Sequence, residues 1–164
     1  MNLVKSIQQY NDNNLFLCEP IKNNIMNEGI FIRILYSSDI ICLNGIYLLI
    51  HLTDIITSEK CYNKYKCNFN INFHKDIIEN LKIIEENILK KYQTHKIPAY
   101  KIYEQLNLGH IKICDNIENK KSCSFILKIS GIWETKNNYG LTYKFLKTNF
   151  HEVMKFIVEK PSVE

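Results

Sequence analysis

The sequence is poor in arginine, alanine, glycine and proline. Arg33 is the only arginine among 21 basic residues, Ala99 is the only alanine, and the 164 residues include five glycines and three prolines. Isoleucine, asparagine and lysine, which have AT-rich codons, fill the gap, so the number of lysines is a weak sign of a binding role. Hydrophobic residues at 46% and charged residues at 23% exclude a disordered chain and a collagen-like or low-complexity fibre.

Long hydrophobic runs are also missing. The longest apolar stretch, Gly45 to Leu52, is much shorter than the ~20 residues that a membrane-spanning helix needs. Met1 to Tyr10 contains no basic segment followed by an apolar run, so no secretory signal is indicated. We therefore expect an intracellular protein with no membrane partner. Its formal net charge of +4 permits contact with a polyanion but falls short of the basic surface of a dedicated duplex-binding protein.

The motifs that identify common enzymes and metal sites are absent. The sequence contains no P-loop, no G-x-G-x-x-G, no G-x-S-x-G and no His-Glu-x-x-His. The six cysteines include no Cys-x2-Cys pair, and the closest two are Cys61 and Cys67, so we expect free thiols in place of zinc ligands or disulfides. The five histidines are scattered along the chain. We predict a non-catalytic protein with no cofactor and no metal.

Hydrophobic periodicity predicts strands on either side of one long helix. Strands are predicted at residues 15–19, 30–36, 46–52, 123–133 and 139–147. Apolar residues at helical spacing predict a helix over residues 75–92, with Glu85 and Glu86 on its solvent face near Lys90. A shorter helix is expected at residues 99–106, and residues 150–158 form either a strand or a terminal helix.

This order of elements is that of an oligonucleotide/oligosaccharide-binding (OB) barrel, in which a helix lies between the third and fourth of five strands. We therefore predict a mainly β protein with helices (α+β), folded as a five-stranded OB-like Greek-key barrel. One domain would cover residues 1–164, with an elaborated loop and helix insertion at about residues 53–122. Asn44-Gly45 predicts a hairpin between residues 40–43 and 46–52, and Gly131 indicates a bulge.

The closing hairpin carries a family resemblance. It runs Phe125-Ile126-Leu127-Lys128-Ile129-Ser130-Gly131-Ile132-Trp133-Glu134 and then Tyr139-Gly140-Leu141-Thr142-Tyr143-Lys144-Phe145. This hairpin resembles the final strands of OB-fold single-stranded DNA-binding proteins of large DNA viruses and phages. In those proteins an aromatic residue ends one strand, and a glycine-led strand of alternating aromatic and basic residues closes the barrel. The resemblance covers roughly the last quarter of the chain and implies an OB fold that binds single-stranded DNA.

Candidate binding residues on the second and third predicted strands follow from alternation. If Ile30, Ile32 and Ile34 fill the core, Phe31 and Arg33 point outward. The same argument turns Tyr47 and His51 outward on the third strand. These two strands form the usual binding face of an OB barrel. Arg33 either contacts a phosphate or a base, or is a surface charge that covers an apolar edge.

The closing hairpin and one loop supply the other candidates. If Leu141, Tyr143 and Phe145 are inside, Lys128 and Lys144 lie outside. Trp133 and Tyr139 flank the hairpin loop and either stack on bases or belong to the core. Residues 53–72 are expected to form mainly a loop, in which lysines and tyrosines alternate. These side chains either capture a nucleic-acid strand or are ordinary solvated loop residues. The candidates in this loop are Tyr62, Lys64, Tyr65 and Lys66.

We therefore predict a non-catalytic single-stranded DNA-binding protein that acts in viral DNA replication, recombination or repair. Binding would depend on phosphate contacts and base stacking, so it would weaken with salt. RNA is an alternative ligand, and a second copy of the chain or replication proteins are further expected partners. The location would be the host cytoplasm or nucleus. The alternative function is a scaffold of a virion or replication complex that uses the barrel to bind proteins.

Overall fold

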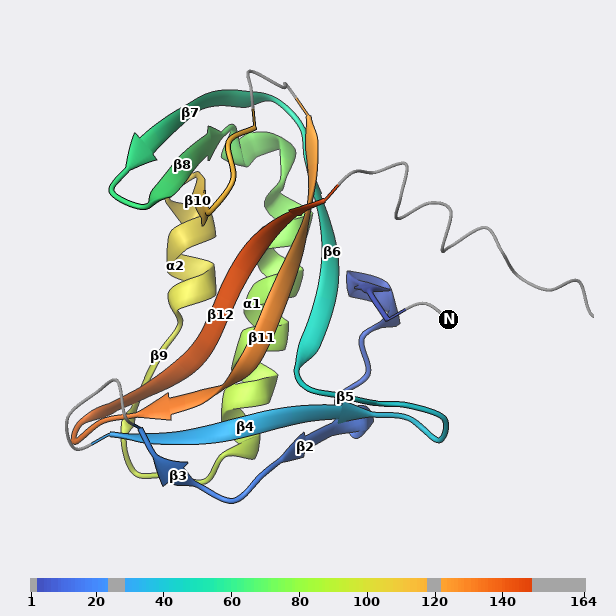
Figure 1. Ribbon diagram of the computed structural model, residues 1–164, viewed down its shortest axis with the longest axis vertical. Helices are drawn as coiled ribbons and strands as arrows, with labels where there is room; N and C mark the ends of the chain where they lie inside the picture. Colours follow the sequence, from blue (N-terminus) through green and yellow to red (C-terminus); the bar gives the residue numbers. More distant parts are fainter. Residues whose placement is uncertain (1–2, 24–28, 118–121, 149–164) are drawn as a thin grey trace, which may run out of the picture.

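The computed structural model describes residues 3–23, 29–117 and 122–148 (Figure 1). Strands account for 49% of these residues, alongside two α-helices, α1 (Lys75–Lys91) and α2 (Lys101–Asn107). Three short 3₁₀ helices lie at Ile7–Gln9, Asp12–Asn14 and Ile71–Phe73. No helix within the described ranges is long and apolar enough to cross a membrane.

The larger sheet is organised around β11 (Cys123–Glu134). One edge of β11 pairs antiparallel with β12 (Asn138–Thr148) over its whole length. The other edge changes partner: its first half pairs with β6 (Ile46–Leu52) and its second half with β4 (Ile30–Ser37). The register shifts between Ile129 and Gly131, where the partner changes, so the predicted bulge at Gly131 is confirmed.

Short strands border these four. β1 (Lys5–Ser6) runs parallel to β6, and β9 (Ile97–Ala99) runs parallel to β12. β4 also pairs with β2 (Leu15–Leu17), β3 (Ile21–Lys22) and β5 (Cys42–Leu43). A separate three-stranded antiparallel sheet contains β7 (Ile55–Cys61), β8 (Lys64–Phe69) and β10 (His110–Ile113). Both helices lie on one side of β11 and β12 (Figure 1).

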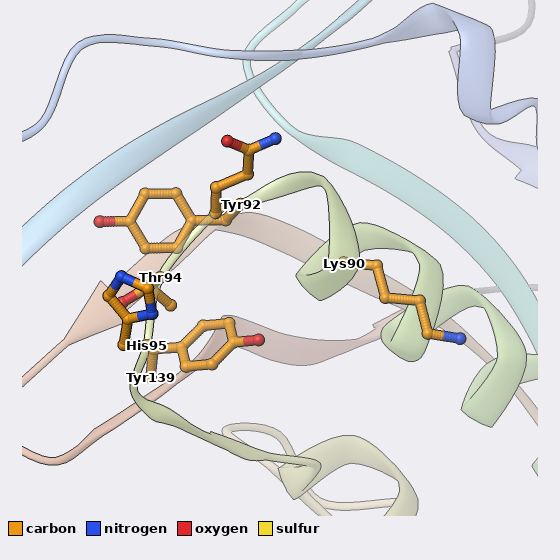
Figure 2. Close-up of a pocket in the computed structure, with 6 residues that line it drawn as sticks. Lys90, Tyr92, Thr94, His95 and Tyr139 are labelled. Atoms are coloured by element: carbon orange, nitrogen blue, oxygen red, sulfur yellow. The ribbon is translucent and has the colours of Figure 1, made fainter.

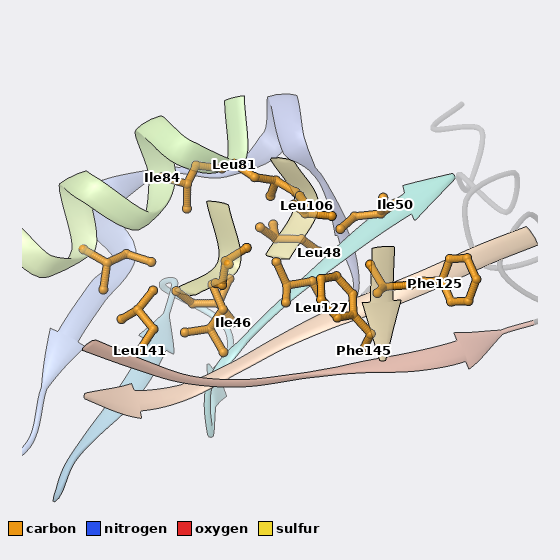
Figure 3. Close-up of a cluster of buried hydrophobic side chains, with 14 of the residues drawn as sticks. Ile46, Leu48, Ile50, Leu81, Ile84, Leu106, Phe125, Leu127, Leu141 and Phe145 are labelled. Atoms are coloured by element: carbon orange, nitrogen blue, oxygen red, sulfur yellow. The ribbon is translucent and has the colours of Figure 1, made fainter. Parts of the chain in front are cut away.

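The core lies between the larger sheet and the helices. Ile46, Leu48 and Ile50 of β6 are almost fully buried, and Figure 3 shows them facing Leu81 and Ile84 of α1. Each fully buried aliphatic side chain of this kind contributes about 1.5–3 kcal/mol relative to an exposed one. The helix predicted over residues 75–92 is confirmed, because one face of α1 supplies the apolar stripe that covers the sheet.

The predicted five-stranded OB barrel is wrong. Neither sheet closes on itself within the described residues. The outer edges of β6 and β12 carry only the short strands β1 and β9, and α1 and α2 fill the inner side of the sheet. Residues 55–69, which were expected to form mainly a loop, make the hairpin β7–β8 of the second sheet instead.

The predicted hairpin at Asn44-Gly45 is also wrong. β5 pairs back with β4, whereas β6 leaves to pair with the first half of β11. Gly45 has a φ of +106°, and a Cβ there would lie 2.6 Å from the carbonyl oxygen of Ile129. The positive φ and the missing side chain of Gly45 therefore let the chain leave β5, which pairs with β4, and enter β6, which pairs with the first half of β11. The shorter helix at residues 99–106 is confirmed as α2, and residues 150–158 lie outside the described residues.

Candidate nucleic-acid interface

The side of the larger sheet that faces away from α1 is here called the outer face. It belongs to β4, β6, β11 and β12, and within the described residues no helix covers it (Figure 1). The alternation predicted for β4 and β6 is confirmed: Ile32, Ile34, Ile46 and Leu48 are buried, and the residues between them point outward. The candidate residues on the outer face are Phe31, Arg33, Tyr47, His51, Lys128, Trp133 and Lys144.

A row of cations and one aromatic ring crosses three strands of the outer face. Lys128 of β11 is the register partner of both Tyr47 on β6 and Lys144 on β12. Its Nζ atom lies 5.1 Å from the centre of the Tyr47 ring, which is within cation–π distance. Lys144 is exposed, whereas Lys128 and Tyr47 are half-buried. The row therefore presents two ammonium groups and a tyrosine ring next to each other.

Two further rings pack over glycines of the neighbouring strand. Phe31 and Trp133 are register partners on β4 and β11. A Cβ at Gly131 would lie 2.5 Å from Cζ of Phe31, and a Cβ at Gly140 would lie 2.7 Å from Cζ2 of Trp133. The indole Nε1 of Trp133 donates a hydrogen bond to the carbonyl oxygen of Leu141 at 3.2 Å. Both rings are half-exposed, and the Trp133 ring is fixed in orientation.

Of the described strands, β4, β6, β11 and β12 place no carboxylate on the outer face. Arg33 is exposed, and no carboxylate of residues 3–23, 29–117 and 122–148 lies within ion-pair distance of it. Glu134 is the only acidic residue in the sequences of β4, β6, β11 and β12. It is buried and paired with Lys96, with 2.5 Å between Oε1 and Nζ. The outer face therefore attracts anions.

His51 occupies the end of the outer face near the start of β11. Its Nδ1 lies 3.0 Å from Oγ of Ser124, and its Nε2 lies 3.1 Å from Oγ of Ser122. The two serines fix the plane of the imidazole ring. Between this group and the Lys128 row, Leu49, Ile126 and Leu146 form an apolar row across β6, β11 and β12.

Tyr139 lies elsewhere. It is the register partner of Glu134 and is buried on the inner side of the sheet, so it does not share a face with Trp133. Its ring lies 6.0 Å from that of Tyr92, between ring centres.

An open pocket of about 540 Å³ lies where α1 ends, and sequence reasoning missed it because its residues come from distant segments. Figure 2 shows the rings of Tyr92, His95 and Tyr139 grouped beside the loop that leaves α1. The lining residues are Lys90, Tyr92, Gln93, Thr94, His95 and Tyr139. Burial and the neighbouring Glu134 carboxylate raise the pKa of Tyr92 to about 12. Burial opposes ionisation of Glu134, but hydrogen bonds from Lys96 and Tyr92 hold its pKa below the usual range.

The loop candidates form a second surface. Tyr62 lies at the turn between β7 and β8 and is 93% exposed, and Lys64 and Lys66 point to the solvent side of β8. Tyr65 points inward and packs against the core. Among the described residues, no group of three or more His, Cys, Asp and Glu side chains could hold a metal ion, and the six cysteines are free thiols.

Comparisons of the chain with models of protein families, with curated proteins and with solved structures find no match. The resemblance of the closing hairpin to viral and phage single-stranded DNA-binding proteins therefore stays a prediction.

Proposed function

We propose that the protein binds single-stranded nucleic acid, without catalysis, on the outer face of its larger sheet. The observation that carries this proposal is that the outer face combines aromatic rings with cations and has no outward carboxylate on its four long strands. The rings belong to Phe31, Tyr47 and Trp133, and the cations to Arg33, Lys128 and Lys144. Cations and exposed rings are the two groups that single strands require, because phosphates bind the cations and unpaired bases stack on the rings.

The shape of the surface favours a single strand over a duplex. The rings of Phe31 and Trp133 lie against the sheet above Gly131 and Gly140, so only a base whose own face is free can stack on them. Bases in a duplex have both faces covered by their neighbours. Each base that stacks contributes about 1–3 kcal/mol, and each phosphate contact makes the affinity depend on salt. Binding in this mode has little sequence preference.

A protein-binding scaffold is the second candidate, and one observation favours it. Phe16 and Ile21 are both 53% exposed on the short strands β2 and β3, where they are register partners of Leu35 and Phe31 on β4. Exposed apolar side chains beside a half-exposed ring are typical of protein–protein contacts.

Fluorescence anisotropy of a labelled thymidine oligomer of ~30 nucleotides tests the first candidate, with a duplex of equal length as control. We expect binding to the single strand that weakens as salt rises, with a slope of log K against log salt of about −0.7 for each phosphate contacted. The double variant Arg33→Gln/Lys128→Gln should reduce the slope by about 1.4 for two lost contacts.

The matched control is Lys75→Gln/Lys101→Gln, which removes two exposed charges at the starts of α1 and α2. It keeps the net charge equal to that of the test variant and leaves the outer face intact. Equal affinity of both double variants would show that total charge, and not the outer face, accounts for binding. Absence of binding at low salt would reject the proposal and favour the scaffold.

A further inference from the structure

The three-stranded sheet has a solvent side that carries its own positive charge. Tyr65, Cys67 and Phe69 of β8 point toward the core, so the residues between them face solvent. On β10, Ile111 and Ile113 are buried, so His110 and Lys112 face the same way. We call this surface the β8–β10 face, and its basic residues are Lys64, Lys66, His110 and Lys112.

The register brings these groups together across neighbouring strands. Lys66 is the partner of Lys112 on one side and of Glu59 on the other. His110 is the partner of Asn68, which lies two residues from Lys66 on the same side of β8. Glu59 is thus the only carboxylate that the described strands β7, β8 and β10 place on this face, against three lysines.

The register of β8 and β10 places the imidazole of His110 close to the ammonium groups of Lys66 and Lys112. Burial and the positive charges of Lys66 and Lys112 lower its pKa, although a hydrogen bond to the backbone of Leu108 acts in the opposite direction. Like charges directly opposite each other on a sheet repel. The folded chain therefore holds two ammonium groups and one imidazole in an arrangement that an anion would stabilise.

An aromatic ring stands at the edge of the same sheet. Tyr62 occupies the β7–β8 turn with a φ of +55°, a left-handed conformation that is uncommon for a residue other than glycine. Its side chain is 93% exposed. The exposed Tyr62 ring, at the end of the β7–β8 hairpin and near its lysines, is therefore available to stack on a base.

We propose that the β8–β10 face is a second contact for the same nucleic-acid strand, in which Lys66, Lys112 and His110 bind phosphate groups and Tyr62 stacks on a base. This inference rests on the proposed function of the outer face, because it takes single-stranded nucleic acid as the ligand. It adds that a long strand contacts both sheets, whereas a short one bound to the outer face does not reach the second.

The test combines oligomer length with charge removal in the full chain. The variant Lys66→Gln/Lys112→Gln is compared with Lys75→Gln/Lys101→Gln, which removes the same charge on the helical side, and both are checked for unchanged thermal unfolding. With a thymidine oligomer of ~30 nucleotides we expect about a tenfold loss of affinity and a salt slope smaller by about 1.4 for the test variant alone. With ~6 nucleotides the two variants should be equal, because the face then makes no contact.

A second readout follows the His110 imidazole by NMR during pH titrations with and without the long oligomer. Bound phosphate should raise the pKa of His110, because it supplies negative charge beside the ring. Equal affinity of both double variants for the long oligomer, or an unchanged His110 titration at saturation, would overturn the inference. The outer-face variant Arg33→Gln/Lys128→Gln would still lower affinity in that case. If no oligomer binds the wild-type chain at all, the proposed function and this inference both fail.

Discussion

The Oε2 atom of Glu85 in α1 accepts a hydrogen bond from the backbone amide of Tyr103 in α2, at 2.8 Å. Its Oε1 atom accepts a second bond from the amide of Ile102 at 3.0 Å. Glu85 is fully buried, so one side chain satisfies two amides of the first turn of α2, which have no partner inside the helix. The hydroxyl group of Tyr143 links β12 to α2 as well, because it donates a hydrogen bond to Oε1 of Gln105 at 2.7 Å.

Glu85 makes the stability of the protein depend on pH near neutrality. Burial raises its pKa from 4.5 to about 7, although the amides of Tyr103 and Ile102 favour the charged form. A carboxyl group with a raised pKa in the folded state contributes stability that is complete below pH 4.5 and is lost as pH rises through 7. Ionised Glu85 therefore costs free energy above pH 7.

Replacing Glu85 with glutamine should remove this dependence. The free energy of unfolding of the wild type should fall relative to that of Glu85→Gln by about 3 kcal/mol between pH 4.5 and 8. Urea unfolding of both proteins at several pH values in this range measures the difference. Parallel pH profiles would contradict the assignment, whatever the constant offset between them. Glu86→Gln, one residue further along α1 and paired with Lys90 at 3.6 Å, is the control.

Lys96 and Glu134 should show the opposite pH dependence. The pKa of Glu134 is lowered, because hydrogen bonds from Lys96 and Tyr92 outweigh burial. This pair therefore contributes stability above pH ~4.5 that is lost as pH falls. Lys96→Met leaves a buried carboxylate without its cation and should cost about 2–4 kcal/mol at pH 7. Lys90→Met breaks only the exposed pair with Glu86 and should cost less than about 1 kcal/mol. Equal losses in urea unfolding would reject this account.

Gly131 should not tolerate a side chain. A Cβ there would lie 2.4 Å from the carbonyl oxygen of Ile32 and 2.5 Å from Cζ of Phe31. The backbone oxygen cannot move without breaking the β4–β11 ladder, so we expect Gly131→Ala to lower the free energy of unfolding by about 1–3 kcal/mol. Ser130→Ala, on the neighbouring residue, should change it by less than ~0.5 kcal/mol. Equal unfolding midpoints for the two variants would show that the bulge can absorb the methyl group.

Local periodicity predicted several elements correctly, but it did not predict their pairing. The alternation in β4 and β6 and the helical spacing in α1 each follow from one buried face. The positions of the apolar residues in the sequence are enough to identify that face. Which edges pair is decided by contacts far apart in the chain. Asn44-Gly45 has the composition of a hairpin turn, yet β6 pairs with the first half of β11, and β4 pairs with the second half beyond the register shift at Gly131.

The errors at β8 and Glu85 have different physical causes. In β8, Tyr65, Cys67 and Phe69 alternate with polar residues, so the strand signal was present but was obscured by the lysines and asparagines on its solvent side. Glu85 was predicted on the solvent face because of its charge. Its burial depends on the amides of α2, which no periodicity in α1 could reveal. The outer-face residues Phe31, Arg33, Tyr47 and His51 were found because strand alternation alone determines their side of the sheet.

Trp133 is the only tryptophan, so its fluorescence reports directly on the outer face. The indole is half-exposed above Gly140 and is fixed by the hydrogen bond to Leu141. A base that stacks on it should quench its emission, because stacking removes solvent and couples the ring to the base.

We expect titration with a thymidine oligomer to quench Trp133 with the same midpoint as the anisotropy change. Phe31→Leu removes the neighbouring ring of the pair and should weaken binding by about 1–3 kcal/mol for one lost stacking platform. Phe73→Leu, at an exposed ring that precedes α1, should leave the midpoint unchanged. If the oligomer binds by anisotropy while Trp133 emission stays constant, the strand contacts the protein away from Trp133. That outcome would reject Trp133 as a stacking platform for the bases.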